Sequence, residues 1–480
     1  QIREALKDFK TGGKFIYTYG DFISQSNYFL ASASDSIFVN PLGGLELKGL
    51  ASNLVFFKGA LDKLEVKPEI FYCGQFKSAT EPFRMEKMSE PNRKQLAAMQ
   101  EDIWNTYLSA FGEHAQTDPD TLNQWAQRGS IQTAYDALTH HLIDGLRYKD
   151  QVETLLRKQS GLNPDDKIRF TDIADYARFL PSPTGDQKIA LLIAEGEIVD
   201  GSSGTGSTDH LIASEDFIKE IRKIRDNDNI KAVVMRVNSP GGSALASEVI
   251  LRELSLLKKK KPLVVSMGDV AASGGYYISC QADSIFALPT TITGSIGVFG
   301  MMFNTQAFFN NKLGVTFDSE KNAPYADMPS ANRPMTPQEK TFIQNGVDSI
   351  YLTFKSRVAS GRNKSANYID SIGQGRIWSG TAAVGNGLID AIGGLNRAFK
   401  SAASLAKIQS YAVETFPASV GKFDRFFRSM KEDGVDEKIL AEQLLQRELG
   451  SDYHWFSILK KMQEQKNHIW MLMPFIPEIK

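Results

Sequence analysis

The sequence predicts an α/β protein that contains two tandem copies of one fold, and two observations lead to this prediction. First, short apolar stretches such as Ile230–Val237 are typical of buried strands, and helical patterns follow them. Second, the chain repeats itself. Gly20–Tyr28 aligns with Gly268–Tyr276 without a gap. At the same offset, Asp35–Pro41 aligns with Asp283–Pro289, so we infer that the fold was duplicated.

Length and composition agree with a globular chain of two or three domains. The chain has 480 residues, of which 42% are hydrophobic and 23% are charged, and its net charge is −1. This balance gives no general bias toward nucleic acid or acidic lipid. No run reaches the roughly 18 apolar residues of a membrane span. Gln1–Lys10 has the pattern of a charged amphipathic helix and not that of a signal peptide.

The repeat also suggests where the domains lie. We expect a first copy over residues 1–180, a linker over 181–186, a second copy over 187–407 and a helical tail over 408–480. The start of the second copy near Gln187 corresponds to a position before residue 1. We therefore expect the first part of the first copy, and any membrane anchor ahead of it, to lie upstream of this chain.

A serine at a strand-to-helix turn is the candidate nucleophile. The apolar strand Pro262–Met267 leads into Ala271–Gly275, and an apolar helix follows. At such a turn we expect the hydroxyl of Ser273 to be accessible, and the amides of Ser273 and Gly274 to point toward the place where a serine attack creates an oxyanion. Taken alone, the stretch is equally typical of a plain turn of small residues.

A second turn follows the strand Ile230–Val237. It contains Asn238–Gly242, and a helical pattern runs from Ser243 to about Leu257. Glycine adopts backbone angles that other residues resist, so the amide of Gly242 could be aimed at a developing negative charge. Our hypothesis is that the two turns supply the two halves of one oxyanion hole, although this turn alone is also typical of a tight loop.

Together these residues resemble a known family. Arg236–Ser243, Ala271–Tyr276 and Thr293–Gly300 closely resemble the motifs of the signal peptide peptidase A (protease IV) family, within the crotonase and Clp protease superfamily. The similarity extends to about Lys407 and fits the long form of the family. It implies two tandem crotonase/Clp-like domains of the ββα superhelix type, with helical extensions.

The two copies differ in the chemistry that they carry. Ser273 aligns with Gln25, so the first copy has no nucleophile at this turn. The first copy contains Phe71–Pro82 instead, whose counterpart Ala323–Asp327 has no lysine. The resemblance implies that Lys77, within this stretch, is the general base. Whether it serves the serine of its own chain or of a neighbour stays open.

A lysine needs a special environment to act as a base. Its ordinary pKa of about 10.4 leaves almost none of it neutral at pH 7. Burial disfavours the ammonium and lowers the pKa. We expect Lys77 to be buried among three aromatic side chains, Phe71, Tyr72 and Phe76.

Three further residues have expected roles in the site. Ser295 matches the second serine of the family, which hydrogen-bonds the lysine amine, although a structural turn serine is the alternative. The amides of Gly242 and Gly274 would hold the oxyanion.

Other kinds of site have weaker support. The six histidines lie in no motif that pairs them with a serine or a metal, so a Ser-His-Asp triad has no candidate. The two cysteines, Cys73 and Cys280, fit no metal-ligand spacing, and we expect both to be buried free thiols.

The function implied is that of a serine endopeptidase with a Ser/Lys dyad and no cofactor. The resemblance implies substrates such as remnant signal peptides and other hydrophobic segments, and a homotetramer. From the charge balance we expect no nucleic-acid partner. The resemblance also implies attachment to the bacterial inner membrane through an anchor upstream of this chain, with the catalytic part facing the periplasm. Two alternatives remain: a crotonase-type acyl-CoA enzyme and an inactive membrane-associated scaffold.

The last part of the chain has two features. Lys431–Leu445 has a helical pattern, and Ile469–Pro477 is mostly apolar but too short to span a bilayer. The apolar segment could pack on a neighbour, lie on a membrane surface, or lie in a hydrophobic substrate groove.

Overall fold

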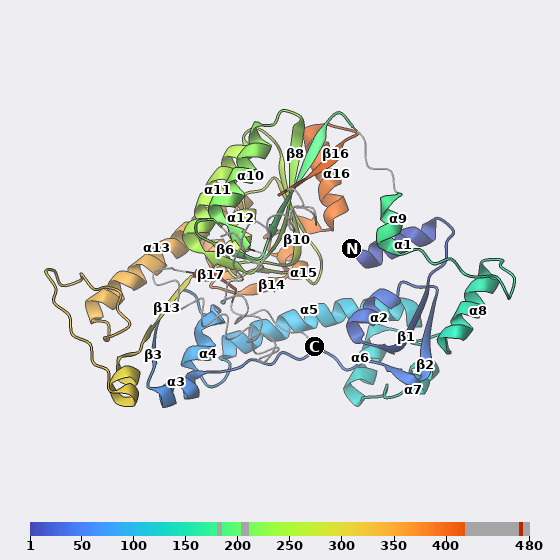
Figure 1. Cartoon of the computed structure of the whole chain (residues 1–480), viewed down its shortest axis with the longest axis horizontal. Coiled ribbons are helices and arrows are strands. Elements are labelled where there is room, and N and C mark those ends of the chain that lie inside the picture. The colour runs from blue at the N-terminus through green and yellow to red at the C-terminus, as the bar shows by residue number, and fades with distance from the viewer. Residues whose placement is uncertain (180–184, 203–210, 418–469, 474–480) are drawn as a thin grey trace, which may run out of the picture.

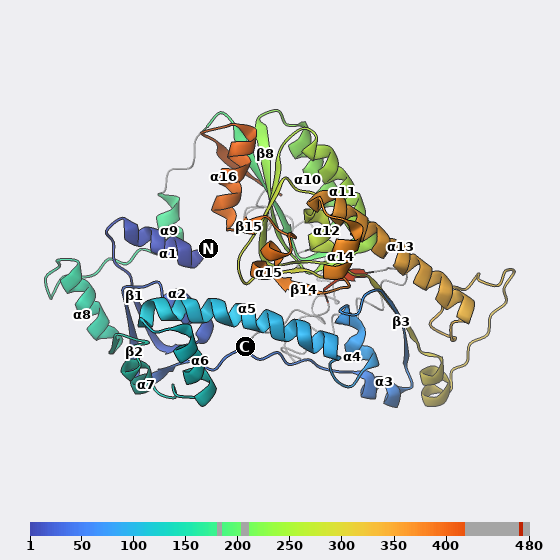
Figure 2. The same cartoon turned by 180° about the vertical axis from the view of Figure 1, so that it is seen from behind.

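The structure is a computed structural model that describes residues 1–179, 185–202, 211–417 and 470–473. The second copy forms a large body that stands over the long helix α5 (Glu90–Ala115), as Figures 1 and 2 show from opposite sides. The small sheet of the first copy lies at one end of α5. Strand β3 (Lys67–Tyr72) lies near the other end.

The body of the second copy is an eight-stranded, mainly parallel sheet in the described residues. Its central strands are β5 (Lys188–Glu195), β8 (Ile230–Ser239) and β10 (Leu263–Ala272). The other strands are β11 (Ser284–Ala287), β12 (Ile292–Gly294), β14 (Ile377–Ser379) and β15 (Ala391–Ile392), with β16 (Ala412–Phe416) from the tail. The prediction of a purely helical tail is wrong here, because this segment pairs with β5 and extends the sheet. Because the central strands are buried on both faces, they are nearly continuous runs of apolar residues.

Helices cover both faces of this sheet (Figure 1). One face packs against α10 (Ser214–Asp226), α11 (Ala244–Lys258) and α12 (Gly274–Ser279), and the other against α16 (Leu395–Ala406). This arrangement confirms the predicted α/β class.

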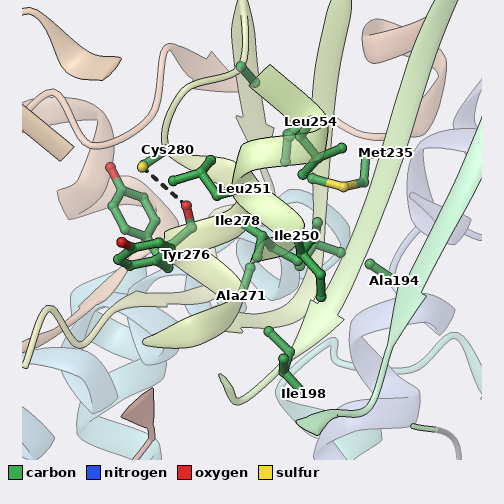
Figure 3. Close-up of a cluster of buried hydrophobic side chains, with 14 of the residues drawn as sticks. Ala194, Ile198, Met235, Ile250, Leu251, Leu254, Ala271, Tyr276, Ile278 and Cys280 are labelled. Carbon is green, nitrogen blue, oxygen red and sulfur yellow. Dashed lines mark hydrogen bonds between the residues drawn. The ribbon is translucent and has the colours of Figure 1, made fainter. Parts of the chain in front are cut away.

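The core beneath the serine turn is closely packed. Figure 3 shows Ile250 and Leu254 from α11 and Ile278 from α12 beside Met235 of β8, and all four side chains are buried. Burial of apolar area contributes about 25 cal/mol per Å². This packing fixes the start of α12, and with it the residue that precedes the helix.

The first copy repeats part of this structure with a smaller sheet. Its parallel strands are β1 (Tyr17–Ile23), β2 (Ser36–Leu45) and β4 (Gly145–Leu146). In this copy the buried Tyr28 hydroxyl donates to the carbonyl of Leu142 at 2.6 Å. At the equivalent place in the second copy, Tyr276 donates to the carbonyl of Leu388 at 2.8 Å. The same buried contact at aligned positions agrees with the predicted duplication.

A six-stranded sheet joins the two copies, with the order β3-β13-β17-β9-β6-β7. Its members besides β3 are β6 (Glu197–Val199), β7 (Leu211–Ala213), β9 (Gly241–Ser243), β13 (Phe299–Asn304) and β17 (Trp470–Leu472). Strand β3 of the first copy runs antiparallel to β13 of the second, with Tyr72 opposite Phe299. This pairing carries the residues after β3 into the second copy.

The remaining helices lie mostly around the first copy and along the outer edge of the second. They are α1 (Ile2–Thr11), α2 (Gln25–Ala31), α3 (Lys58–Leu64), α4 (Glu81–Arg84), α6 (Pro119–Arg128), α7 (Ala134–Thr139), α8 (Lys149–Gln159), α9 (Ile173–Arg178), α13 (Pro337–Arg362), α14 (Ala366–Ile372) and α15 (Gly380–Gly385). None of the helices in the described ranges is long and apolar enough to cross a membrane.

Two predicted segments lie wholly or partly outside the described residues. These are the helical pattern of the tail, Lys431–Leu445, and most of the linker at 181–186. The apolar segment Ile469–Pro477 is described only over residues 470–473, where it forms β17 and the residue after it.

Candidate active site

Ser273 lies at the turn between β10 and α12, and it is buried, so the prediction of an accessible hydroxyl is wrong in this structure. Its backbone has φ 55° and ψ −116°, an uncommon conformation for a residue with a side chain. The backbone of β8 packs closely against this turn, since a Cβ on Gly275 would lie 2.6 Å from the carbonyl oxygen of Ser239. The prediction that the Ser273 amide faces the oxyanion is wrong, because this amide donates to the carbonyl of Gly294 at 2.8 Å. The amide of Gly274 is the one left for that role.

Lys77 reaches this turn from the other copy. It follows β3 and precedes the 3₁₀ turn Ser78–Thr80, and its side chain is 1% exposed. Its Nζ lies 3.0 Å from Ser273 Oγ and 3.0 Å from Ser295 Oγ. A third contact joins Nζ to the carbonyl oxygen of Ser295 at 3.4 Å. The structure therefore brings Lys77, Ser273 and Ser295 together within one chain.

Burial favours the neutral form of this lysine. Loss of hydration lowers the pKa of Lys77 well below its ordinary value. Among the described residues, no carboxylate forms an ion pair with its Nζ. A neutral amine has one lone pair and two N–H groups, and the three contacts match this count. The lone pair can accept the O–H of Ser273 while the N–H groups donate to Ser295.

The walls around Lys77 differ from the predicted aromatic pocket. Phe71 is buried, but Tyr72 is 37% exposed and packs under the guanidinium of Arg84 at 4.8 Å. Backbone from the second copy encloses the lysine stem instead. A Cβ on Gly375 would lie 2.6 Å from the Cβ of Lys77, and one on Gly297 would lie 3.2 Å from its Cδ. These glycines let the chain close over the lysine and exclude water.

Ser295 is fixed at the end of β12. Its φ is 50°, again unusual for a residue with a side chain, and its amide donates to the carbonyl of Arg376 at 2.7 Å. The hydroxyl and the carbonyl of this one residue thus both face the amine of Lys77. This arrangement can orient the lysine lone pair toward Ser273.

The two glycines predicted for the oxyanion hole lie next to each other. Gly242 belongs to β9 and has φ 153°, and a Cβ there would lie 2.0 Å from the carbonyl oxygen of Ile198. A Cβ on Gly274 would lie 3.2 Å from the amide nitrogen of Gly242. The two turns singled out in the sequence therefore meet beside Ser273.

Gln95 is a site residue that sequence reasoning missed. It is 1% exposed on α5, and its Nε2 donates to the carbonyl of Phe76 at 3.2 Å and to Ser78 Oγ at 3.1 Å. Its Oε1 accepts from the amide of Ile377 at 3.2 Å. Gln95 thus ties the loop that holds Lys77 to the second copy. Its place within an amphipathic helix pattern gave no indication of this role.

The cysteines lie outside this cluster. Cys280 is a buried free thiol as predicted, whereas Cys73 is also free but only partly buried. The Sγ of Cys73 donates to Asp348 Oδ1 at 2.8 Å. In the part of the chain that the structure describes, no group of three or more possible metal ligands is present.

Comparison with known proteins places the chain in a family. The model of peptidase family S49 matches residues 8–163 and 255–409. The chain belongs to peptidase family S49. The first matched segment contains Lys77, and the second contains Ser273 and Ser295.

Three curated relatives of this S49 chain cover most of its length. Protease 4 of Salmonella typhi is 36% identical over 438 residues, which are 89% of this chain and 70% of that protein. Protease 4 of Haemophilus influenzae is 36% identical over 86% of this chain and 69% of that protein. Serine protease SPPA, chloroplastic, of Arabidopsis thaliana is 32% identical over 85% of this chain and 61% of that protein. The chain is therefore a serine protease of family S49.

Proposed function

We propose that this serine protease is an endopeptidase with a Ser/Lys dyad, in which Ser273 is the nucleophile and Lys77 is the general base. The observation that carries the proposal is the 3.0 Å contact between Lys77 Nζ and Ser273 Oγ, made by an amine that is almost wholly buried. A neutral amine in hydrogen-bond contact with a hydroxyl can take its proton.

The cycle follows from the contacts. Lys77 removes the proton as Ser273 Oγ attacks a peptide carbonyl, and the amides of Gly242 and Gly274 hold the oxyanion that forms. The ammonium of Lys77 then gives its proton to the departing amine. Water, deprotonated by the same lysine, releases the acyl group from the serine. Ser295 keeps the amine aimed at the serine throughout.

The substrates that we propose are hydrophobic peptides such as remnant signal peptides. A related protein of Enterococcus faecium, 35% identical over 51% of this chain, has the name putative signal peptide peptidase SppA. We also propose a homotetramer at the bacterial inner membrane, anchored upstream of this chain, with the catalytic part facing the periplasm. These last points rest on the family resemblance alone.

The two alternatives account less well for the site. An acyl-CoA enzyme of the crotonase type has no use for a buried lysine in contact with a serine hydroxyl. In an inactive scaffold, nothing would maintain a buried amine whose desolvation costs stability. Binding of a coenzyme A ester would favour the first alternative, and failure of Ser273 to react with an acylating inhibitor would favour the second.

The test is cleavage of fluorogenic peptides with a small or apolar residue before the scissile bond. The parent chain is compared with Ser273→Ala and Lys77→Ala, and the size of each protein in solution is measured in parallel. We expect activity in the parent and its loss in both variants, with size unchanged. Full activity of either variant would contradict the proposed dyad.

A further inference from the structure

The last described strand of the chain lies against the turn proposed for the oxyanion hole. Strand β17 runs antiparallel to β9, with Met471 opposite Gly242. After the strand, the amide of Met473 donates to the carbonyl of Pro240 at 2.7 Å. The chain thus contributes an extended segment of its own beside the catalytic serine.

On its other side, β17 pairs antiparallel with β13, where Trp470 lies opposite Phe299. The segment is therefore held between two strands, β9 and β13, that both lead to or from site residues. An extended peptide that adds to two strand edges gains main-chain hydrogen bonds whatever its sequence. A protease that binds extended peptides needs a groove of this kind.

The register brings one carbonyl of β17 close to Gly241, in the turn proposed for the oxyanion hole. A Cβ on Gly241 would lie 1.9 Å from the carbonyl oxygen of Met471 and 2.7 Å from the amide nitrogen of Gly274. The carbonyl oxygen of Met471 and the amide nitrogen of Gly274 therefore both lie close to Gly241, beside the catalytic serine.

Two side chains of the segment are buried in apolar surroundings. Met471 is 0% exposed and belongs to the main core of the second copy. Met473 is 3% exposed and belongs to a cluster that includes Ala272, next to Ser273, and Met99 of α5. Because methionine is flexible and unbranched, it fills such pockets without a close shape match. The groove thus receives alternate apolar side chains of an extended chain.

We propose that β17 is a tethered occupant of the peptide-binding groove, which competes with substrate for the site. Of the three places open to this apolar segment, the structure favours the groove. The inference rests on the proposed function, because a competitor matters only if peptides bind there. A covalently linked segment acts at an effective concentration in the millimolar range, so even weak binding reduces access for substrate.

The test uses two variants that free the groove. The first is a chain that ends at Ile469, and the second is the full chain with Met471→Asp, which puts a charge into the apolar pocket. The control is Leu42→Asp, because Leu42 is 94% exposed in the first copy. The readouts are the rate at which a fluorophosphonate probe labels Ser273, and the KM and kcat for a fluorogenic peptide.

We expect both groove variants to be labelled about tenfold faster than the parent, with KM lowered by a similar factor and kcat within about twofold. A synthetic peptide with the sequence of residues 467–475 should inhibit the shortened chain competitively. The same peptide with Met471→Asp should inhibit less. The control should match the parent.

Equal labelling rates and equal KM values in the parent and in Met471→Asp would overturn the inference and leave the proposed function standing. If no folded chain were labelled at Ser273 at all, the proposed function would fail and the inference with it. Should the shortened chain lose its fold, as thermal unfolding would reveal, the full-length Met471→Asp variant decides alone.

Discussion

Lys77 Nζ lies 3.0 Å from Ser273 Oγ, although 196 positions separate the two residues in the sequence. The contact depends on the pairing of β3 with β13, which carries a loop of the first copy into the second. Each copy therefore holds only part of the site. The first copy has Gln25 at the place of Ser273, and the counterpart of the Lys77 segment in the second copy, Ala323–Asp327, has no lysine.

Lys77→Met should separate catalysis from stability. It removes the proposed base but fills most of the space of the lysine stem. We expect kcat/KM to fall by about 10²- to 10⁴-fold. The free energy of unfolding at pH 7 should stay the same or rise, because a buried amine that lacks a carboxylate partner no longer has to be desolvated.

Urea unfolding and peptide cleavage measure the two effects. Lys94→Met is the matched control, since Lys94 is exposed on the neighbouring helix α5. Lys94→Met should change neither kcat/KM nor the free energy of unfolding. A Lys77→Met variant that unfolds in less urea than Lys94→Met would show that the amine stabilises the fold.

We expect the free energy of unfolding to rise with pH because of Lys77. Burial lowers its pKa in the folded chain below the 10.5 of an ordinary lysine. Between these two pKa values the unfolded chain binds one more proton than the folded chain, so stability rises with pH. Below the lowered pKa the full penalty of the buried ammonium applies, and above about 10.5 the penalty is gone.

The measurement is the difference in unfolding free energy between the parent and Lys77→Met as a function of pH. The slope should be about 1.4 kcal/mol per pH unit inside this window and zero below it. A difference that stays flat from neutral pH to pH 10 would mean that Lys77 has an ordinary pKa.

Ser295→Gly should lower kcat without changing KM. Glycine accepts the φ of 50° at this position, so the hydroxyl is removed without added backbone strain. The carbonyl contact to Lys77 remains, and we expect a loss of about 10- to 100-fold in kcat. Ser295→Thr keeps a hydroxyl and should restore part of the rate. If Ser295→Gly kept its full rate, the hydroxyl would have only a structural part.

Gly242→Ala should reduce the rate by displacing the oxyanion turn. The new Cβ would lie 2.0 Å from the carbonyl oxygen of Ile198, so the backbone must shift. We expect a loss of about 10²- to 10³-fold in kcat, as for removal of one oxyanion donor. Gly385→Ala is the control, because a Cβ there meets no atom within 4 Å. Equal kcat values in the two variants would exclude Gly242 from the site.

Much of this site could be predicted from the sequence, because its residues lie at recognisable turns. Ser273 follows a buried strand, and the gapless repeat exposed the differing residue Gln25 in the first copy. Hydrophobic periodicity indicates local secondary structure, and alignment of the sequence with itself detects the duplication.

Contacts between distant segments were not predictable in the same way. Gln95 hydrogen-bonds the second copy, and Gly375 packs against Lys77. Both contacts depend on how the two copies pack, and no local sequence pattern indicates that packing. Likewise, the apolar residues of β17 were compatible with several partners. Only the packed structure distinguishes a strand in the groove from a surface segment.

The most direct test of the central claim is the pH dependence of Ser273 acylation, with the modified residue identified by mass spectrometry. If a neutral Lys77 activates the serine, the acylation rate of the parent rises with pH and levels off well below pH 10.5, and this rise disappears in Lys77→Met. An unchanged rate and profile in Lys77→Met would contradict the account.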